Sequence, residues 1–482
     1  MSRNIFRWFI LLITITAMLL SSACVLFDSD EPGRQTEETQ ETPSDETEPT
    51  IETLPLPDTR ELEDREILSA WSGLDGVEKN VLKQLINEFN AESEHTFIQL
   101  ASMSWPLLNQ KMSAVSAAGN GPDFIIQDYP QLKTYHSWGL LTGIGEIYTS
   151  DPPFDGLVYD VRKNQYPENV VRELSLAAAG NGPARDVAVP MTYIPQRLFY
   201  RSDLLETHGY EAPPATIEEL FSIAASLAEE QGVIQYGLAL TFEQIFGPLA
   251  INQLGQPAVD AGSRETRFLT DAFAQYLESI VSLTENGVMP DESENSAQLF
   301  RSGQLLMYVG DVYDVSTHED AGISFDLAPL PGGPGAQKQV TEAYLFIPTV
   351  FINNRVSHFA EWVNFWNTSE SQRIWSLRTG HPPVITDYSD FEDDWEWLES
   401  WGPAFTPSLE AFSLDSNTLQ PEYETIYDQY LRSYWLQALS GSLTVDEALE
   451  QAGEALEAYF EALRVSEAEA EEAETDDSEA ED

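Results

Sequence analysis

Patterns of apolar and polar residues divide the first part of the chain into strands and helices. Ile67–Trp71 and Thr96–Ala101 have the pattern of strands, and Val77–Phe89 between them places apolar residues at helical spacing. A second helical pattern, Trp105–Val115, precedes a third strand at Asp123–Gln127. This repeated order predicts an α/β fold in which helices cover both faces of a mostly parallel sheet.

Ligands of such sheets bind beyond the carboxyl ends of the strands. Applied here, this rule selects residues that end or directly follow the three predicted strands. We take four of them as candidate ligand-binding residues: Trp71, Ser72, Trp105 and Asp128.

A proline-containing segment connects this part of the chain to the next. Two short extended runs, Val187–Val189 and Leu198–Tyr200, lie on either side of Pro190 and Pro195. Proline has no N–H for a strand ladder and favours extended geometry in the residue before it, so we interpret the segment as a straight connector rather than the middle of a sheet. We expect the chain to pass here from one lobe to another, with Tyr193 at the base of the gap.

The second part of the chain carries a further set of elements. Thr216–Glu219 is a capping box that begins a helix, and Tyr236–Leu240 has the pattern of a strand. Trp362 and Trp366 follow helical spacing and are expected in a core. Three more candidates for the binding site lie at the ends of predicted strands: Asp311, Tyr313 and Glu342. Tyr313 fits either a stacking platform or a buried tyrosine at a strand end.

The N-terminus has the layout of an export signal. Arg3 and Arg7 precede an apolar run of 13 residues, Trp8–Leu20, which is short for a membrane span. Cys24 follows it and is the only cysteine, so no intrachain disulfide is possible. The run Leu20–Cys24 resembles a bacterial lipoprotein signal, although Ser21 stands where leucine is favoured. The alternative is an ordinary secretory peptide with an incidental cysteine.

Several runs, in order, resemble the extracellular solute-binding proteins of ABC transporters, the family that includes maltose-binding protein. The runs are Trp71…Glu78…Leu82…Phe89-Asn90, Pro122-Asp123-Phe124, Gly139-Leu140-Leu141, Val189-Pro190, Phe199–Leu205, Phe300–Met307, Pro329–Gly333 and Ser369–Gly380. The likeness extends from Ile67 to about Phe460. It departs from the family pattern at Arg201-Ser202, where Asn-Lys is usual, and at Gln304, where lysine is usual.

The resemblance implies a two-lobed, periplasmic-binding-protein-like fold of type II. Lobe 1 would comprise residues 67–190 and 334–400, and lobe 2 residues 191–333 and 401–464. A signal peptide (1–23) and an acidic disordered tether (24–66) would precede the lobes, and an acidic disordered tail (465–482) would follow them. Trp71, Trp105, Tyr193 and Tyr313 would stack on a ligand between the lobes, and Asp128, Asp311 and Glu342 would hydrogen-bond to it.

The resemblance further implies that the protein captures a carbohydrate and delivers it to membrane permease subunits. It would be a monomer outside the cytoplasm, anchored to the membrane through a lipid on Cys24. Neither a cofactor nor a catalytic residue is implied. Sugars present apolar ring faces to aromatic side chains and hydroxyl groups to polar ones, which suits the candidate residues.

The net charge of the chain limits the classes of molecule that it could bind. The chain of 482 residues has a net charge of −57, and the acidic residues are dense at both ends, with 15 in residues 25–66 and ten in residues 465–482. Such a chain would repel nucleic acid, so we expect no nucleic-acid partner. A neutral or cationic ligand is compatible with the charge, and solubility alone also accounts for it.

Three alternative functions stay open at this point. The same fold could bind a polyamine or another organic cation, the chain could be a lipid-anchored surface glycosidase, or it could present its ligand to a sensor. No nucleophile elbow, zinc-protease motif, Walker loop or dinucleotide fingerprint occurs, and the six histidines lack the spacing of metal ligands. The sequence therefore favours binding over catalysis.

Overall fold

The computed structural model describes most of the chain after residue 50. The described residues are 51–57, 62, 65–148, 160–177, 183–230, 232–291, 294–311, 313–333, 339–387, 412–415, 418, 420 and 422–479. The export signal, Cys24 and most of the tether lie outside these ranges, as do Trp395, Trp397 and Trp401.

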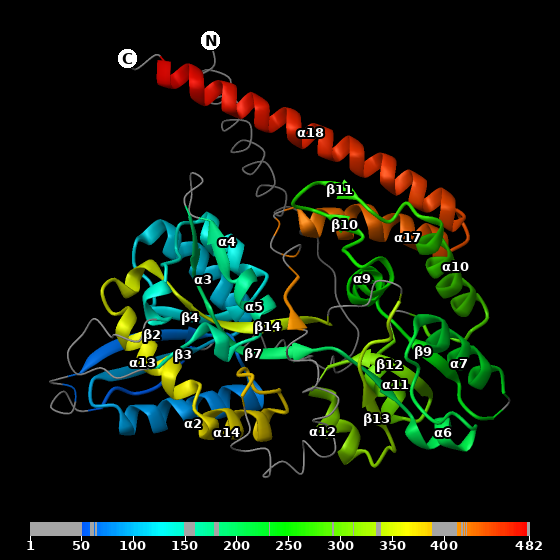
Figure 1. The fold of residues 1–482 in the computed structure, drawn as a ribbon, viewed down its shortest axis with the longest axis horizontal. Helices are drawn as coiled ribbons and strands as arrows, with labels where there is room; N and C mark the ends of the chain where they lie inside the picture. The colour runs from blue at the N-terminus through cyan, green and yellow to red at the C-terminus, as the bar shows by residue number, and fades with distance from the viewer. Residues whose placement is uncertain are drawn as a thin grey trace, which may run out of the picture. The chain divides into compact units, whose positions relative to one another are not determined.

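Parallel strands form the centre of the first sheet, as the apolar pattern predicts. They are β2 (Glu66–Ser72), β3 (Thr96–Ser102) and β4 (Phe124–Asp128), and the helices α2 (Gly76–Glu92) and α3 (Trp105–Ala118) alternate with them. The antiparallel strand β14 (Gln339–Pro348) extends the sheet beyond β4, which gives the order β1-β3-β2-β4-β14-β15. This arrangement confirms the predicted alternation of strands and helices (Figure 1).

A short strand from the expected tether lies at the edge of this sheet. Strand β1 (Glu52–Thr53) pairs antiparallel with β3, and the Leu54 amide donates to the Leu100 carbonyl at 2.9 Å. The Glu52 carboxylate lies 3.4 Å from the Lys79 ammonium on α2 and also pairs with Lys83. The expectation of a disordered tether over all of residues 24–66 is therefore corrected for residues 51–57.

The prediction of a straight connector between the lobes is also corrected. Strand β7 (Val189–Pro195) contains both prolines and pairs antiparallel with β14, with Pro190 opposite Leu345 and Pro195 opposite Thr341. In the described residues β7 pairs on one side only, and an edge strand tolerates residues that lack an N–H. Only Gln196 separates β7 from β8 (Arg197–Tyr200), which belongs to the second sheet (Figure 1).

The second sheet has the strand order β13-β8-β12-β9. Strand β9 (Tyr236–Ala239) runs parallel to β12 (Leu305–Gly310), whereas β8 is antiparallel to both β12 and β13 (Asp326–Ala328). The predicted capping box is present at Thr216, whose hydroxyl accepts from the Glu219 amide at the start of α7 (Ile217–Glu229). The helices α10 (Asp271–Glu285) and α17 (Arg432–Leu439) complete the core beside α7.

Each lobe has its own main cluster of buried side chains. The first extends from Leu68 to Tyr193 and resumes from Ala343 to Leu414, and the second lies between Leu198 and Phe460. Met191 and Tyr193, expected in lobe 2, belong to the first cluster, so the passage between the lobes lies at Gln196 and not at residue 190. Smaller elements around these cores are α4 (Gln131–Ser137), α5 (Glu168–Glu173), α6 (Ser202–Thr207), α8 (Phe242–Phe246), α9 (Pro248–Leu254), α11 (Ser296–Arg301), α12 (Tyr313–Asp320), β5 (Ser175–Ala177), β6 (Ala184–Asp186), β10 (Val259–Asp260), β11 (Glu265–Thr266) and β15 (Phe412–Ser413).

Helices from the C-terminal third return to both cores. Helix α13 (Val356–Trp366) buries Trp362 and Trp366 completely in the first core, which confirms their predicted role. Helix α14 (Ser369–Thr379) follows a Thr368 cap, whose hydroxyl accepts from the Ser371 amide, and is ended by Gly380 with φ of +83°.

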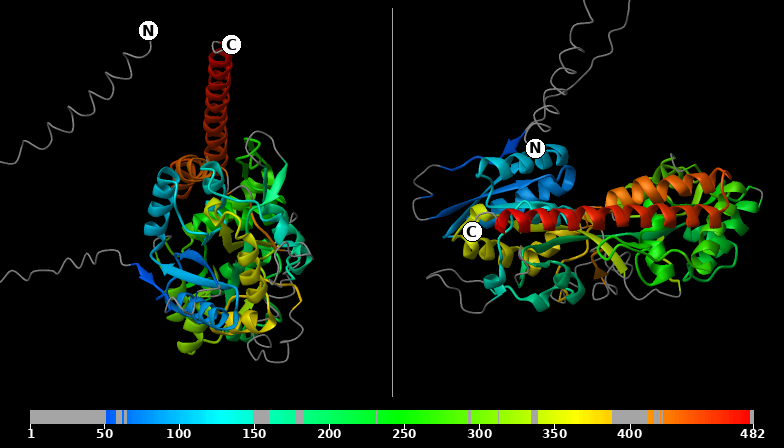
Figure 2. Two further views of the ribbon diagram at one scale, coloured as in Figure 1. Left: turned by 90° about the vertical axis from the view of Figure 1, so that its left-hand side faces the viewer. Right: turned by 90° about the horizontal axis from the view of Figure 1, so that it is seen from above.

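The last helix, α18 (Val445–Glu479), is unbroken and much longer than expected (Figure 2). The prediction of a disordered tail therefore fails over residues 465–479, because alanine and glutamate are strong helix formers. An ion pair between Arg264 and Glu467 also holds the start of this extension.

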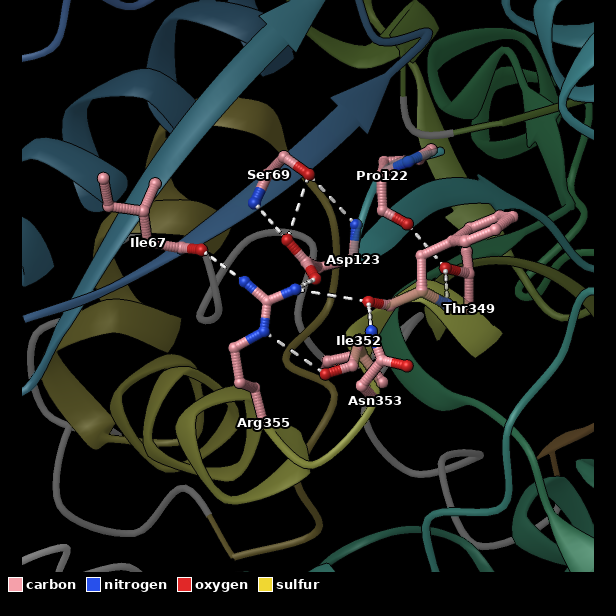
Figure 3. Close-up of polar contacts among 9 residues, drawn as sticks. Ile67, Ser69, Pro122, Asp123, Thr349, Ile352, Asn353 and Arg355 are labelled. Carbon is pink, nitrogen blue, oxygen red and sulfur yellow. Dashed lines mark hydrogen bonds and ion pairs between the residues drawn. The ribbon is translucent and has the colours of Figure 1, made fainter. Parts of the chain in front are cut away.

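The motif Pro122-Asp123-Phe124 has a structural role. Figure 3 shows the Asp123 carboxylate between Ser69 on β2 and the Arg355 guanidinium. Asp123 accepts from the Ser69 amide at 2.8 Å and from its hydroxyl at 3.0 Å, while Arg355 also donates to the Ile67 carbonyl at 2.8 Å. This cluster joins β2, the start of β4 and the start of α13 at the amino ends of the parallel strands.

Candidate functional site

The carboxyl ends of the parallel strands lie beside the middle of β14. Ser72 is opposite Ser102 where β2 and β3 end, and Asp128 at the end of β4 is opposite Tyr344 in the middle of the antiparallel β14. Sequence-distant residues are thus neighbours along one edge of the first sheet, where α/β proteins bind their ligands.

Two aromatic side chains pack against each other at this edge. The ring centroids of Trp105 and Tyr344 are 5.5 Å apart and the rings are inclined by 33°. Trp105 begins α3, and its indole lies directly over Gly73, where any Cβ atom would fall 2.0 Å from the ring. Both rings are only half-buried, so each retains surface that a ligand could cover.

Two further carboxylates lie close enough to Glu342 to act on it at this edge. Burial raises the pKa of Asp128 from its ordinary value to about 6. The pKa of Glu342 is also raised, first because surrounding protein displaces solvent and then because of the negative charges of Asp311 and Asp128. Glu342 itself is solvent-accessible, so a ligand could reach it. Since Asp311 directly follows β12 of the second sheet, acids from both lobes contribute to the group.

We call Trp105, Asp128, Asp311, Glu342 and Tyr344 the strand-end site. Four of the eight candidate ligand-binding residues predicted from the sequence, Trp105, Asp128, Asp311 and Glu342, lie in it. Tyr344 is the added member. It was not chosen among the candidate ligand-binding residues, and its position opposite Asp128 in the pairing of β14 with β4 adds it.

The other candidates lie elsewhere or contribute differently. Tyr193 is fully buried in the first core, where its hydroxyl donates to the Val384 carbonyl at 3.1 Å, so its ring has no free face for a ligand. Ser72 is buried, and its hydroxyl accepts from the Leu74 amide at 3.1 Å, which shapes the turn after β2. The side chain of Tyr313, the first residue of α12, is outside the described part of the chain.

Trp71 lines a separate shallow groove. The Lys111 ammonium lies 5.6 Å from the Trp71 ring centroid, and Ser69 and Pro122 line the same groove. Because Ser69 and Pro122 lie toward the amino ends of the strands, this groove extends away from the strand-end site.

Residues after position 412 approach the site as well. The Lys133 ammonium on α4 donates to the Gln420 amide oxygen, and Tyr423 has a raised pKa, first because it is buried and then because of nearby charges that include Asp415 and Glu342. The sequence carries no signal for these neighbours, since they depend on how the chain passes from the first lobe to the second after β15.

In residues 51–479, apart from the gaps given above, no group of three or more His, Cys, Asp or Glu side chains could hold a metal ion. The helices of that part of the chain also include none that is long and apolar enough to cross a membrane.

Comparison with known proteins agrees with this architecture. The family model described as bacterial extracellular solute-binding protein matches residues 84–400. A Brucella abortus protein described as a binding protein is 24% identical over 263 residues, which cover 51% of this chain and 58% of that protein. The chain thus spans 58% of the length of the curated relatives it matches.

Solved structures show the same fold. The cyclic alpha-maltosyl-1,6-maltose binding protein from Arthrobacter globiformis has a TM-score of 0.67 and 20% identity, covering 82% of this chain and 98% of that one. The sugar-binding protein MalE from Xanthomonas citri has a TM-score of 0.69 and 17% identity, covering 83% and 98%. These similarities confirm the predicted two-lobed periplasmic-binding-protein fold.

Proposed function

The chain belongs to the bacterial extracellular solute-binding protein family, and on that premise we propose that it captures a carbohydrate of the maltodextrin type at the strand-end site. The family consists of solute-binding proteins, which accords with the expectation of a binding protein and not an enzyme. Relatives that share the fold are named for binding maltose-type saccharides.

The observation that carries the proposal is the aromatic pair beside carboxylates. The half-buried rings of Trp105 and Tyr344 could cover the apolar face of a sugar ring, as aromatic side chains do in carbohydrate sites. Asp128 and Glu342 could accept hydrogen bonds from the hydroxyl groups at the edge of that ring. Asp311 would add a contact from the second lobe, so the ligand would bridge the two lobes.

Replacement of Trp105 tests this proposal. We expect Trp105→Ala to weaken maltotetraose binding by about tenfold or more, because an aromatic stacking contact is worth ~1 kcal/mol beyond its buried area. Isothermal titration calorimetry measures the affinity. The matched control is Trp138→Ala, which removes an exposed tryptophan next to Tyr135 and should bind like the unaltered protein. Equal affinities for both variants would contradict the proposed stacking role.

A second candidate ligand is an organic cation such as spermidine. Burial and then the negative charges of Asp311 and Asp128 raise the pKa of Glu342, which favours this ligand, since a bound cation would relieve that repulsion. A thermal-shift screen of the protein with maltotriose, maltotetraose and spermidine separates the two ligands, because binding to the folded state alone raises the melting temperature. A shift with spermidine and none with either saccharide would replace the carbohydrate proposal.

The proposed cellular role is that of an extracytoplasmic lipoprotein that delivers its ligand, as a monomer, to membrane permease subunits. The Leu20–Cys24 run supports a lipid anchor at Cys24. Cys24→Ser should shift the protein from the membrane fraction to the soluble fraction, and mass spectrometry of the unaltered protein should find acyl chains on Cys24. An unchanged distribution would argue for an ordinary secretory signal.

A further inference from the structure

The turn that carries Asp311 lies against a small polar group of two buried side chains, Tyr308 and His318, and the half-buried Asp314. Strand β12 ends at Gly310, Asp311 follows it, and α12 begins at Tyr313. The backbone hydrogen bond that closes this turn is long, since the Asp314 amide lies 3.3 Å from the Asp311 carbonyl. Side chains beneath the turn therefore contribute to its position.

Three side chains meet directly beneath Gly310. The Tyr308 hydroxyl donates to the Asp314 carboxylate at 3.0 Å and lies 2.5 Å from Nε2 of His318. A Cβ atom on Gly310 would lie 2.7 Å from the Tyr308 ring and 2.9 Å from the Asp314 carboxylate, so the polar group packs tightly against the turn. We call Tyr308, Asp314 and His318 the turn triad.

Aromatic rings enclose the turn triad. His318 is fully buried, and its ring centroid is 4.9 Å from that of Phe300, 5.4 Å from Phe199 and 5.5 Å from Phe325. Tyr308 is 2% exposed and stacks on Phe199. Polar groups in such an apolar setting are costly unless they bond to one another, so the triad is held together strongly.

The number of available polar hydrogens determines which atom donates in each hydrogen bond of the turn triad. Tyr308 has one hydroxyl hydrogen and donates it to Asp314, so His318 must donate from Nε2 to the tyrosine oxygen. In the described residues Nδ1 of His318 has no hydrogen-bond partner, and the Nε2–H tautomer leaves only a lone pair there. The opposite direction would leave a buried N–H without an acceptor, which proteins rarely tolerate.

The surrounding charges support a neutral histidine. Burial and then the Arg301 guanidinium lower the pKa of His318 to about 4. Burial raises the pKa of Asp314, while Tyr308 and Arg301 oppose that increase. Burial, then Asp314 and then Asp311 raise the pKa of Tyr308, and Asp311 also contributes, after burial, to the raised pKa of Glu342, so the triad and the strand-end site share this carboxylate as a neighbour.

We propose that the His318-to-Tyr308-to-Asp314 hydrogen-bond chain is a positioning device that holds the β12–α12 turn, and with it Asp311, in place for the ligand. The role in ligand binding rests on the proposed function of the strand-end site, whereas the role in holding the turn does not. Glutamine at position 318 can supply the same N–H donor to Tyr308, but leucine cannot.

The first test examines the ring of His318 directly. Long-range ¹H–¹⁵N correlation spectra of the uniformly labelled protein should show His318 as the neutral Nε2–H tautomer, with its signal assigned by its loss in His318→Gln. A neutral Nδ1–H tautomer for His318 would overturn the proposed direction of the chain.

The second test compares His318→Gln with His318→Leu. We expect backbone amide exchange across residues 310–320 to rise by about tenfold in the leucine variant, the equivalent of one lost hydrogen bond, and to stay near the original rate in the glutamine variant. Maltotetraose affinity should fall by about the same factor in the leucine variant only. Equal exchange rates in the two variants would overturn the positioning role.

The two tests also separate this inference from the proposed function. If the unaltered protein does not bind maltotetraose, the carbohydrate proposal fails while amide exchange and tautomer still decide the role of the triad. If the leucine variant does not fold, Tyr308→Phe replaces it, because that variant keeps the ring and removes the central hydroxyl; unchanged exchange across residues 310–320 would then contradict the proposal.

Discussion

At the scale of single residues, Asp128 connects the strand-end site to pH. Its pKa is raised to about 6 by burial, well above the ordinary value of 3.8. The folded state therefore binds more protons than the unfolded state between these two values. By linkage, the contribution of Asp128 to stability is fully present below about pH 4 and is lost as the pH rises through about 6.

The variant Asp128→Asn isolates this effect. Asparagine has nearly the same shape and does not titrate, so we expect the variant to gain stability relative to the unaltered protein as the pH rises from 4 to 7. Urea unfolding at several pH values measures the difference. Two curves that stay parallel over this range would show that Asp128 is not held at a raised pKa.

At the scale of elements, the Asp123–Arg355 cluster should contribute substantially to the stability of the first sheet. Asp123 is buried and joins β2, β4 and α13 through Ser69 and Arg355 (Figure 3). We expect Asp123→Asn to lower the free energy of unfolding by about 2 kcal/mol, because the buried carboxylate loses its charge-assisted hydrogen bonds from Ser69 and Arg355. Urea unfolding measures this loss.

An exposed ion pair provides the control for that prediction. Arg162 and Asp160 pair at the surface, with more than half of each side chain exposed. Arg162→Ala should leave the unfolding midpoint unchanged within error. If both variants were equally stable, the Asp123 cluster would contribute no more than a surface pair.

The individual helices and strands also show how far the sequence alone could predict the structure. Local patterns were sufficient for β2, α2, β3, α3 and β4, because each buries a face with its own periodicity. The pattern failed at β7, where two prolines sit in an edge strand whose partner, β14, lies about 150 residues away. Pairing over such a distance leaves no local signal.

The strand-end site, like the fold, could be predicted only in part from the sequence. Trp105 and Asp128 follow predicted strands, so the rule for strand ends found them. Tyr344 was missed because its place depends on β14 pairing with β4, and Tyr193 was misplaced because β7 joins the first core. Residues from different lobes can be grouped only once both sheets are known.

At the scale of the whole molecule, two separate cores and a linker of one residue between β7 and β8 suit a protein whose lobes close around a ligand. We expect maltotetraose to lower the radius of gyration measured by small-angle X-ray scattering. Trp105→Ala at the same saccharide concentration is the control and should show a smaller change. No change in the unaltered protein at a saturating concentration would mean that binding does not involve closure.

The small strand β1 sets a limit on distance. Because Glu52 and Thr53 pair with β3, only the 28 peptide links from Cys24 to Glu52 can separate an anchor from the first lobe. Even fully extended, that length spans roughly 90 Å, compared with roughly 140 Å if the chain were unpaired up to Glu66. A lipid on Cys24 would therefore confine the protein to a shell of that radius, and any permease that it serves must lie inside it.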